Sequence, residues 1–333
     1  PISLFYKYHN KSFNDVLNIF FSDEDLKSIL RMPAGNIGAS PKNSSALSML
    51  FLYREFLFNP HYYPEEGMGD FSSKLKDKFV EFGGHFLPSS EVIKFLKSAN
   101  KYVILTKNKE KFYANTIVFN ISPMQIIKIC SNIEISNKIK GVFKNLIISP
   151  SAYFINFGLE KDYNFAIDDI KVNNLLYFIL DDTCRIFKGK DENKFKKYYL
   201  NSRSVFVSFS SPRVVRALIL APFSNSCNLN QRVFENIINR INFLKDFLFM
   251  VKTASFSTPL DLYNFTYNYK GACYGWLTLK TLKNFYNSFL NLYDNIFLCG
   301  HWVPNIFGNS GITGVINSGK KCANFLLKKN KYD

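Results

Sequence analysis

Polar caps and short apolar stretches alternate over the first sixty residues, a pattern that predicts helices. Ser12 can cap a short apolar helix, and Ser22 with Asp25 resembles a capping box at the start of the next one. Residues 44–58 are apolar on nearly every side, so we expect that helix to be buried. The pattern therefore predicts a helical unit over residues 1–60.

The pattern changes between residues 61 and 130. Four apolar side chains recur there at helical spacing, namely Phe71, Leu75, Phe79 and Phe82. Gly83 and Gly84 end this helix, and β-like runs follow, with a hairpin at residues 108–110. The last run ends at Asn120 and shows little alternation, so we expect that strand to be covered on both faces.

Residues 145–222 hold several β-rich segments separated by charged loops, which predicts an antiparallel or mixed sheet. A long amphipathic helix pattern follows at 230–251, and Ser257 or Thr258 can cap a further helix that has Pro259 in its first turn. The expected fold class is therefore α/β, or mixed α+β. We expect two interleaved domains, one of residues 61–130 and 291–333, the other of residues 1–60 and 131–290.

Composition places the chain among globular proteins, because 47% of its 333 residues are hydrophobic and 20% are charged. No apolar run reaches the ~20 residues of a membrane span, and no signal peptide is visible. Six Cys without metal-ligand spacing predict free thiols in a reducing compartment, and four His far apart in sequence predict no metal site.

The net charge of +16 raises the question of an anionic partner. Only 8 of the 42 basic residues are arginine, the side chain that best recognises phosphate, and the lysines are spread along the chain. We therefore expect no nucleic-acid binding; the alternative, a nucleic-acid-associated protein, predicts strongly salt-dependent retention. Scattered lysines favour peripheral attachment to an anionic membrane surface, in a cytoplasmic protein.

The clearest chemical pattern lies near the C-terminus. An apolar strand at Ile296–Cys299 leads into Gly300, and a helix crowded with small residues follows a loop. The small positions are Gly311, Gly314, Ser318 and Gly319. A strand, a glycine-bearing loop and a helix N-terminus form a general cradle for an anionic cofactor. The alternative is a tight contact between helix and sheet with no ligand.

Six passages carry a wider resemblance. They are "YYPEEGMGDFSSKL" (62–75), "FGGHFLPSSEVIKFL" (82–96), "ANTIVFNISP" (114–123), "SPSAYFINFGL" (149–159), "TPLDLYNFTYNYKGACYGW" (258–276) and "NIFLCGHW…GITGVINSGKKCA" (295–323). In this order they resemble the phytoene desaturase family of FAD-dependent oxidoreductases, which includes carotenoid isomerases and retinol saturases. The resemblance implies an FAD-binding, Rossmann-like domain interleaved with a substrate domain of mixed sheet and helices.

The resemblance also implies roles for single residues. Val92 would hold the adenine through its backbone, and Asn120 would end a strand beside the cofactor; a core valine and a turn former are the alternatives. Gly300 and His301 would lie near the ribityl and pyrophosphate groups. The helix start would present N–H groups to the pyrophosphate and isoalloxazine from Gly311, Ile312 and Gly314. Tyr274 and Trp276 would line the substrate pocket, or equally pack in an aromatic core. We assign no catalytic residue.

The G-x-G-x-x-G fingerprint of such a cofactor domain is absent from the chain; "GMGDFS" (67–72) is its nearest approach. We therefore expect the chain to be the C-terminal portion of a longer enzyme that requires an upstream FAD-binding segment. The expected reaction is flavin chemistry on C–C bonds of an apolar polyene or isoprenoid. The alternatives are an amine-oxidase-like enzyme and a non-catalytic remnant that binds no flavin.

Overall fold

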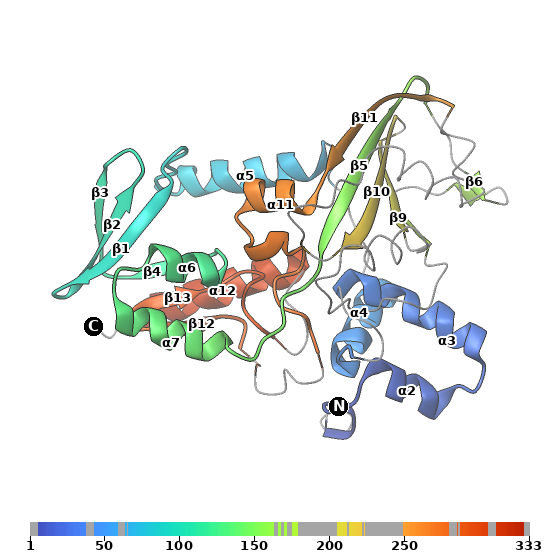
Figure 1. Ribbon diagram of the computed structural model, residues 1–333, viewed down its shortest axis with the longest axis horizontal. Coiled ribbons are helices and arrows are strands. Elements are labelled where there is room, and N and C mark those ends of the chain that lie inside the picture. The colour runs from blue at the N-terminus through green and yellow to red at the C-terminus, as the bar shows by residue number, and fades with distance from the viewer. Residues whose placement is uncertain are drawn as a thin grey trace.

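Figure 1 shows a computed structural model of the chain. The structure describes residues 6–37, 43–58, 64, 66–162, 166–167, 170–171, 175–178, 205–211, 213–221, 223, 249–279, 285, 287–305 and 311–329. Helices and strands alternate through these ranges, and the strands form several separate sheets. The expected mixed α/β class is therefore confirmed. Among the described residues, no helix combines the length and the apolar character needed to cross a membrane.

The first described unit is helical, with α2 (Phe13–Phe20), α3 (Glu24–Arg31) and α4 (Ala46–Phe58). Ser12 caps α2 as expected, in a reciprocal capping box with Asp15. The expected cap of α3 at Ser22 is wrong, because the carboxylate of Asp23 accepts the Leu26 N–H at 2.9 Å. Aspartate and serine are both good caps, so the sequence pattern fixed the helix start only to within one residue.

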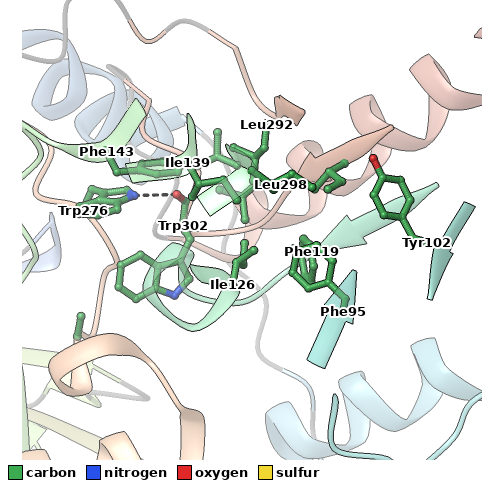
Figure 2. Close-up of a cluster of buried hydrophobic side chains, with 14 residues drawn as sticks. Phe95, Tyr102, Phe119, Ile126, Ile139, Phe143, Trp276, Leu292, Leu298 and Trp302 are labelled. Carbon is green, nitrogen blue, oxygen red and sulfur yellow. Dashed lines mark hydrogen bonds between the residues drawn. The ribbon is translucent and has the colours of Figure 1, made fainter. Parts of the chain in front are cut away.

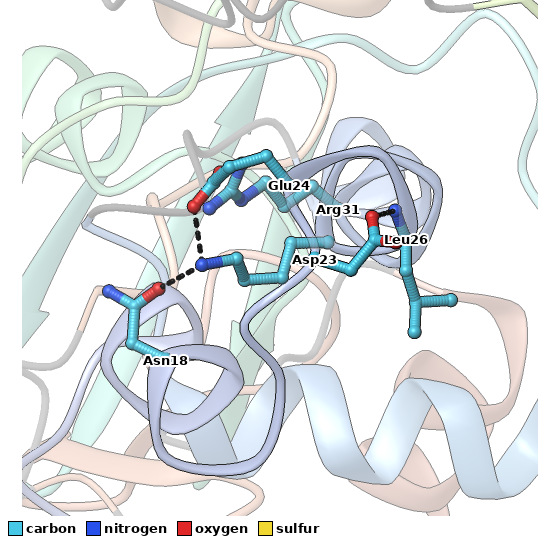
Figure 3. A network of polar contacts seen from close by, with 6 residues as sticks. Asn18, Asp23, Glu24, Leu26 and Arg31 are labelled. Atoms are coloured by element: carbon cyan, nitrogen blue, oxygen red, sulfur yellow. Dashed lines mark hydrogen bonds and ion pairs between the residues drawn. The ribbon is translucent and has the colours of Figure 1, made fainter.

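A buried lysine joins α2 to α3. The Lys27 side chain pairs with Glu24 on its own helix, and its Nζ donates to the side-chain oxygen of Asn18 on α2 at 3.1 Å (Figure 3). Arg31 pairs with the same Glu24 at 3.3 Å. A charged side chain is buried only when such partners satisfy it, and the hydrogen bond to Asn18 ties α3 to α2.

The expectation that the third helix is buried is only partly correct. Met49 of α4 is fully buried, whereas Leu50, Phe51, Leu57 and Phe58 are exposed. An all-round apolar pattern cannot show which side of a helix has a neighbour. The outer side and the C-terminal end of α4 therefore present apolar surface to solvent.

The next unit is α5 (Gly67–Glu81) followed by a three-stranded antiparallel sheet of β1 (Val92–Ser98), β2 (Lys101–Thr106) and β3 (Lys111–Ala114). The expected hairpin is confirmed, with Lys109 at φ +67° in its turn. None of the residues of α5 is buried, and the apolar stripe along it, which includes Leu75 and Phe79, is exposed. In Figure 1, α5 lies beside this sheet in the upper part of the view.

A second three-stranded sheet has the order β12 (Leu290–Tyr293), β13 (Ile296–Leu298) and β4 (Ile117–Phe119). β13 pairs with β4 in parallel, so segments far apart in sequence share one sheet. Helices α6 (Pro123–Ile129), α7 (Ile133–Phe143) and α12 (Ile312–Lys329) lie around it (Figure 1). The expectation that β4 is covered on both faces is wrong, because Val118 is 43% exposed.

The largest sheet has the order β11 (Val251–Ser257), β5 (Ser151–Leu159), β10 (Val214–Ala221), β9 (Val205–Ser211) and β8 (Leu175–Phe178). All its pairs are antiparallel. Two short strands, β6 (Ala166–Ile167) and β7 (Ile170–Lys171), form a separate pair. Thr258, not Ser257, caps α11 (Pro259–Thr266). The amphipathic helix expected at 230–251 falls almost wholly outside the described residues.

The main described core surrounds the β12–β13–β4 sheet (Figure 2). Trp276 stacks on Phe143 with ring centroids 5.4 Å apart and meets Trp302 edge to face at 5.3 Å. The indole N–H of Trp276 donates to the Trp302 carbonyl at 2.8 Å. A smaller core joins the N-terminal helices to Leu277 and Leu279. These contacts hold the residues around position 275 against the C-terminal segment.

Candidate cofactor site

Two predicted site residues meet where the parallel strands β4 and β13 end. The N–H of Cys299 donates to the Phe119 carbonyl at 2.9 Å, and Asn120 and Gly300 are the next residues of the two strands. A Cβ on Gly300 would lie 1.8 Å from Oδ1 of Asn120, so the amide packs directly against the glycine backbone. Gly300 has φ +86°, which favours glycine. In open α/β sheets, ligands bind beyond this carboxyl edge.

A buried serine fixes helix α12 to the same edge. The Gly300 N–H donates to the hydroxyl of Ser318 at 2.8 Å, and that hydroxyl donates to the Ser288 carbonyl. At the other end of the helix, the Lys329 ammonium donates to the Asn295 side chain at 2.5 Å. Because Ser318 lies by the end of β13 and Lys329 by its start, α12 runs antiparallel to the strand.

The N-terminus of α12 extends beyond the strand edge. Ser318 is six residues along the helix from Ile312, a distance of about 9 Å at 1.5 Å per residue. The Gly311 carbonyl accepts the first helical hydrogen bond, from Val315, at 3.0 Å. The first N–H groups of a helix have no acceptor within it, and the helix dipole makes that end electropositive. Gly311 and Ile312 are exposed, so this end is open to an anionic group.

His301 packs against a second glycine. A Cβ on Gly275 would lie 2.6 Å from the His301 carbonyl oxygen and 2.9 Å from Cδ2 of its ring. Gly275 has φ +67°, and its own carbonyl accepts the Ser149 N–H at 2.8 Å. The neighbouring Tyr274 N–H donates to the Ser149 hydroxyl at 2.9 Å. The segment that holds the predicted residue Tyr274 is therefore fixed beside His301.

The ring of His301 is held in its neutral form. Burial lowers the pKa of His301 to about 4, because a charged imidazolium would lose its hydration. Its Nε2 atom is buried and has no hydrogen-bond partner within the described ranges. A buried polar atom without a partner is costly in a folded protein, so Nε2 is a natural point of contact for a bound group.

The depressed pKa gives a signed pH prediction. Between pH 6.5 and 4 the unfolded chain binds a proton at His301 that the folded chain does not, so stability falls as pH falls. We expect the wild type to lose about 2 kcal/mol more than His301→Gln between pH 7 and pH 5, at ~1.4 kcal/mol per pH unit. Urea denaturation at both pH values measures this difference, and equal losses in the two proteins would contradict it.

The structure separates the two predicted pocket residues. Trp276 lies inside the aromatic core, stacked on Phe143, with its N–H satisfied by Trp302. That is the position of a core side chain, the alternative that the sequence left open. Tyr274 is half-buried at the edge of the same segment, next to Gly275. Of the two, Tyr274 has the more suitable position for contact with a ligand.

Val92 lies in a different sheet from the strands that lead to Asn120 and Gly300. It begins β1, pairs with Thr106 across a register shift, and its side chain is exposed. Within the part of the chain that the structure describes, no hydrogen bond joins it to the strand edge at Gly300. Its role in adenine binding stays a prediction.

The hydrogen-bonding roles of two residues in this region could not be predicted from the sequence. Ser318 is visible only as one small residue among several, yet its buried hydroxyl joins Gly300 to Ser288. Asn268 gives no signal in the pattern, although its side chain accepts the indole N–H of Trp302 at 2.9 Å. No cluster of three or more metal-ligating side chains occurs among the described residues.

No protein-family model matches the chain, and no curated protein sequence does. Solved structures share its fold. A CLA-producing fatty acid isomerase from P. acnes matches 95% of this chain and 66% of its own, with a TM-score of 0.57 and 10% identity. An oxidoreductase from Methanosarcina mazei matches 97% of this chain and 71% of its own, with a TM-score of 0.57 and 11% identity. Cyclohexylamine oxidase from Brevibacterium oxydans IH-35A matches 98% of this chain and 69% of its own, with a TM-score of 0.55 and 11% identity.

These similarities define the fold of the chain as one that occurs in oxidoreductases and an isomerase. The chain spans about two thirds of the length of these structures. The matches run through nearly all of its own residues, so the fold extends over both the strand edge at Gly300 and the large sheet.

Proposed function

We propose that the chain is part of an FAD-dependent oxidoreductase. The observation that carries the proposal is the strand edge where Asn120 and Gly300 meet beside helix α12, which begins at Ile312. The helix N-terminus offers N–H groups to a phosphate, and the strand edge lies where open α/β sheets bind nucleotides. The shared fold with an oxidoreductase and an amine oxidase supports the same reading.

The residues present fit such a cofactor. Nε2 of His301 has no hydrogen-bond partner among the residues that the structure describes, and a Cβ on Gly311 would meet nothing within 4 Å, so the helix start has room for a ligand. Asn120, Gly300, His301, Gly311, Ile312 and Gly314 would hold the group, with Val92 at the adenine. The flavin supplies hydride transfer when bound. The chain's own task is to fix the position of the group and to keep water from it.

For the substrate we propose an apolar polyene or isoprenoid, with reaction at a C–C bond. Half-buried Tyr274, next to the strand edge, offers an aromatic surface for such a chain. An amine-oxidase-like reaction is the second candidate, and the fold shared with cyclohexylamine oxidase favours it equally. Peripheral attachment to a membrane surface belongs to the first proposal, supported by exposed apolar side chains such as Phe20, Leu57 and Phe58.

We further propose that a dinucleotide-binding segment with a G-x-G-x-x-G turn completes the site. In the described sheet, β4 stands at the edge with Val118 exposed, although parallel strands are usually covered. The exposed stripe of α5, which includes Leu75 and Phe79, also lacks cover among the described residues. A βαβ unit supplies both a strand for such an edge and helices for its faces.

Flavin content tests the proposal directly. We would express the longest reading frame that contains this chain, purify the product and measure bound flavin by its visible absorbance. Stoichiometric FAD is expected, and a flavin-free protein that also fails to take up added FAD would support a non-catalytic remnant. Turnover of a polyene without turnover of a polyamine separates the first candidate from the amine-oxidase-like one.

A further inference from the structure

The central strand of the large sheet has two unlike faces. Successive residues of a strand point to opposite faces. On β5, Tyr153, Ile155 and Phe157 are fully buried on one face, whereas Phe154 and Asn156 on the other are only half-buried. The second face is therefore the more open of the two, and it mixes apolar with polar side chains.

A polar row crosses this open face. Asn156 pairs with Arg216 of β10 on one side and with Ser255 of β11 on the other. The Arg216 Nε donates to the Asn156 side-chain oxygen at 2.8 Å, and the Asn156 amide donates to the Ser255 hydroxyl at 3.3 Å. The amide thus holds the guanidinium through Nε alone. The two terminal amino groups form the planar, two-pronged edge that matches a carboxylate.

Arg216 differs from two other arginines of the chain in its partners. Arg213, just before the same strand, is paired with Asp162, and Arg31 is paired with Glu24. Within the described ranges, no carboxylate lies at ion-pair distance from Arg216. The neighbours of Arg216 therefore hold its position without neutralising its charge.

An apolar row lies next to the polar one, toward the candidate cofactor site. Phe154 pairs with Leu218 across β5 and β10, and both side chains are half-buried on the open face. Beyond them, β5 begins at Ser151, next to Ser149, which is bonded to Gly275. Asn156 is five residues along the strand from Ser151, about 17 Å at ~3.3 Å per residue.

We propose that Arg216 binds the carboxylate of an amphiphilic substrate, a long aliphatic or polyene chain with a terminal acid. The chain of this substrate lies along Phe154 and Leu218 and points toward the Gly275–His301 end of the strand. This inference rests on the proposed function, because it assigns the substrate class of the same site. A pure hydrocarbon has no group for the guanidinium, whereas a long-chain acid engages the polar row and the apolar row together.

Binding of oleate and of its uncharged methyl ester tests the assignment. Isothermal titration calorimetry with the purified chain, at ligand concentrations below aggregation, should show oleate binding at least tenfold more tightly than methyl oleate. Arg216→Gln should remove that preference. Arg213→Gln is the matched control, since it removes the same charge from the same strand region and should keep the preference. Circular dichroism should show both variants folded, because both side chains are exposed.

A second variant keeps the arginine and changes its neighbour. Asn156→Asp places a carboxylate of nearly the same shape beside Arg216, so the guanidinium is neutralised within the protein and the preference for oleate should fall as in Arg216→Gln. Equal binding of acid and ester by the wild type, binding of neither, or an unchanged preference in Arg216→Gln would overturn the proposal. FAD uptake, measured separately, decides the proposed function, because Arg216 has no part in holding the flavin.

Discussion

Gly275→Ala should destabilise the chain by about 3 kcal/mol, the sum of ~1–2 kcal/mol for a left-handed backbone and ~1–3 kcal/mol for a forced contact. Gly275 has φ +67°, and the added Cβ would lie 2.6 Å from the His301 carbonyl oxygen. That oxygen belongs to the backbone, so it cannot relieve the contact by a change of rotamer as a side chain could. Urea denaturation followed by circular dichroism measures the change.

Gly319→Ala is the matched control. A Cβ at Gly319 meets nothing within 4 Å, and the residue lies inside α12, where alanine is the better helix former. We expect this substitution to stabilise the chain by about 0.5–1 kcal/mol. A Gly275→Ala protein as stable as the wild type would show that the contact between the two segments is looser than described.

Trp302→Ala should cost about 3–5 kcal/mol, the range for removal of a large buried aromatic side chain. Trp302 is 0% exposed and lies edge to face against Trp276. The substitution leaves a cavity and also deprives the Asn268 side chain of its indole donor. The midpoint of chemical denaturation, read by circular dichroism, should move to markedly lower urea.

The control for Trp302→Ala removes an aromatic ring from the surface. Phe265 of α11 is 85% exposed, so Phe265→Ala should change the free energy of unfolding by less than about 0.5 kcal/mol. Similar losses in the two variants would mean that the cluster around Trp302 does not form the core of this region.

Local patterns in the sequence were sufficient to predict where two strands end, at Asn120 and at Gly300, but not that these ends meet. An apolar run that stops at a glycine, and another that stops at Asn120, are visible without any contact information, and the structure places the two residues together. The helix start at Ser12 was equally accessible, and the one at Thr258 was predicted to within one residue, because a cap depends on residues within one turn.

Features that depend on distant neighbours were not accessible. The sequence shows that α4 and β4 are apolar but not which sides have partners, so the exposure of Phe58 and Val118 was missed. Arg216 meets Asn156 only through the register of two strands some sixty positions apart, and one residue of slippage would place them on opposite faces. For Trp276, burial within an aromatic cluster depends on a chain segment 26 residues away.

The two ties on α12 have a consequence for how quickly a ligand can be captured. Hydrogen bonds at Ser318 and at Lys329 attach the helix to the two ends of β13, so its position is fixed at two points. The N-terminal end of the helix, at which we propose that a phosphate binds, is therefore positioned before any ligand arrives, and it loses little conformational entropy on binding. Capture at that end should therefore proceed at the rate of encounter, without a slow closing step.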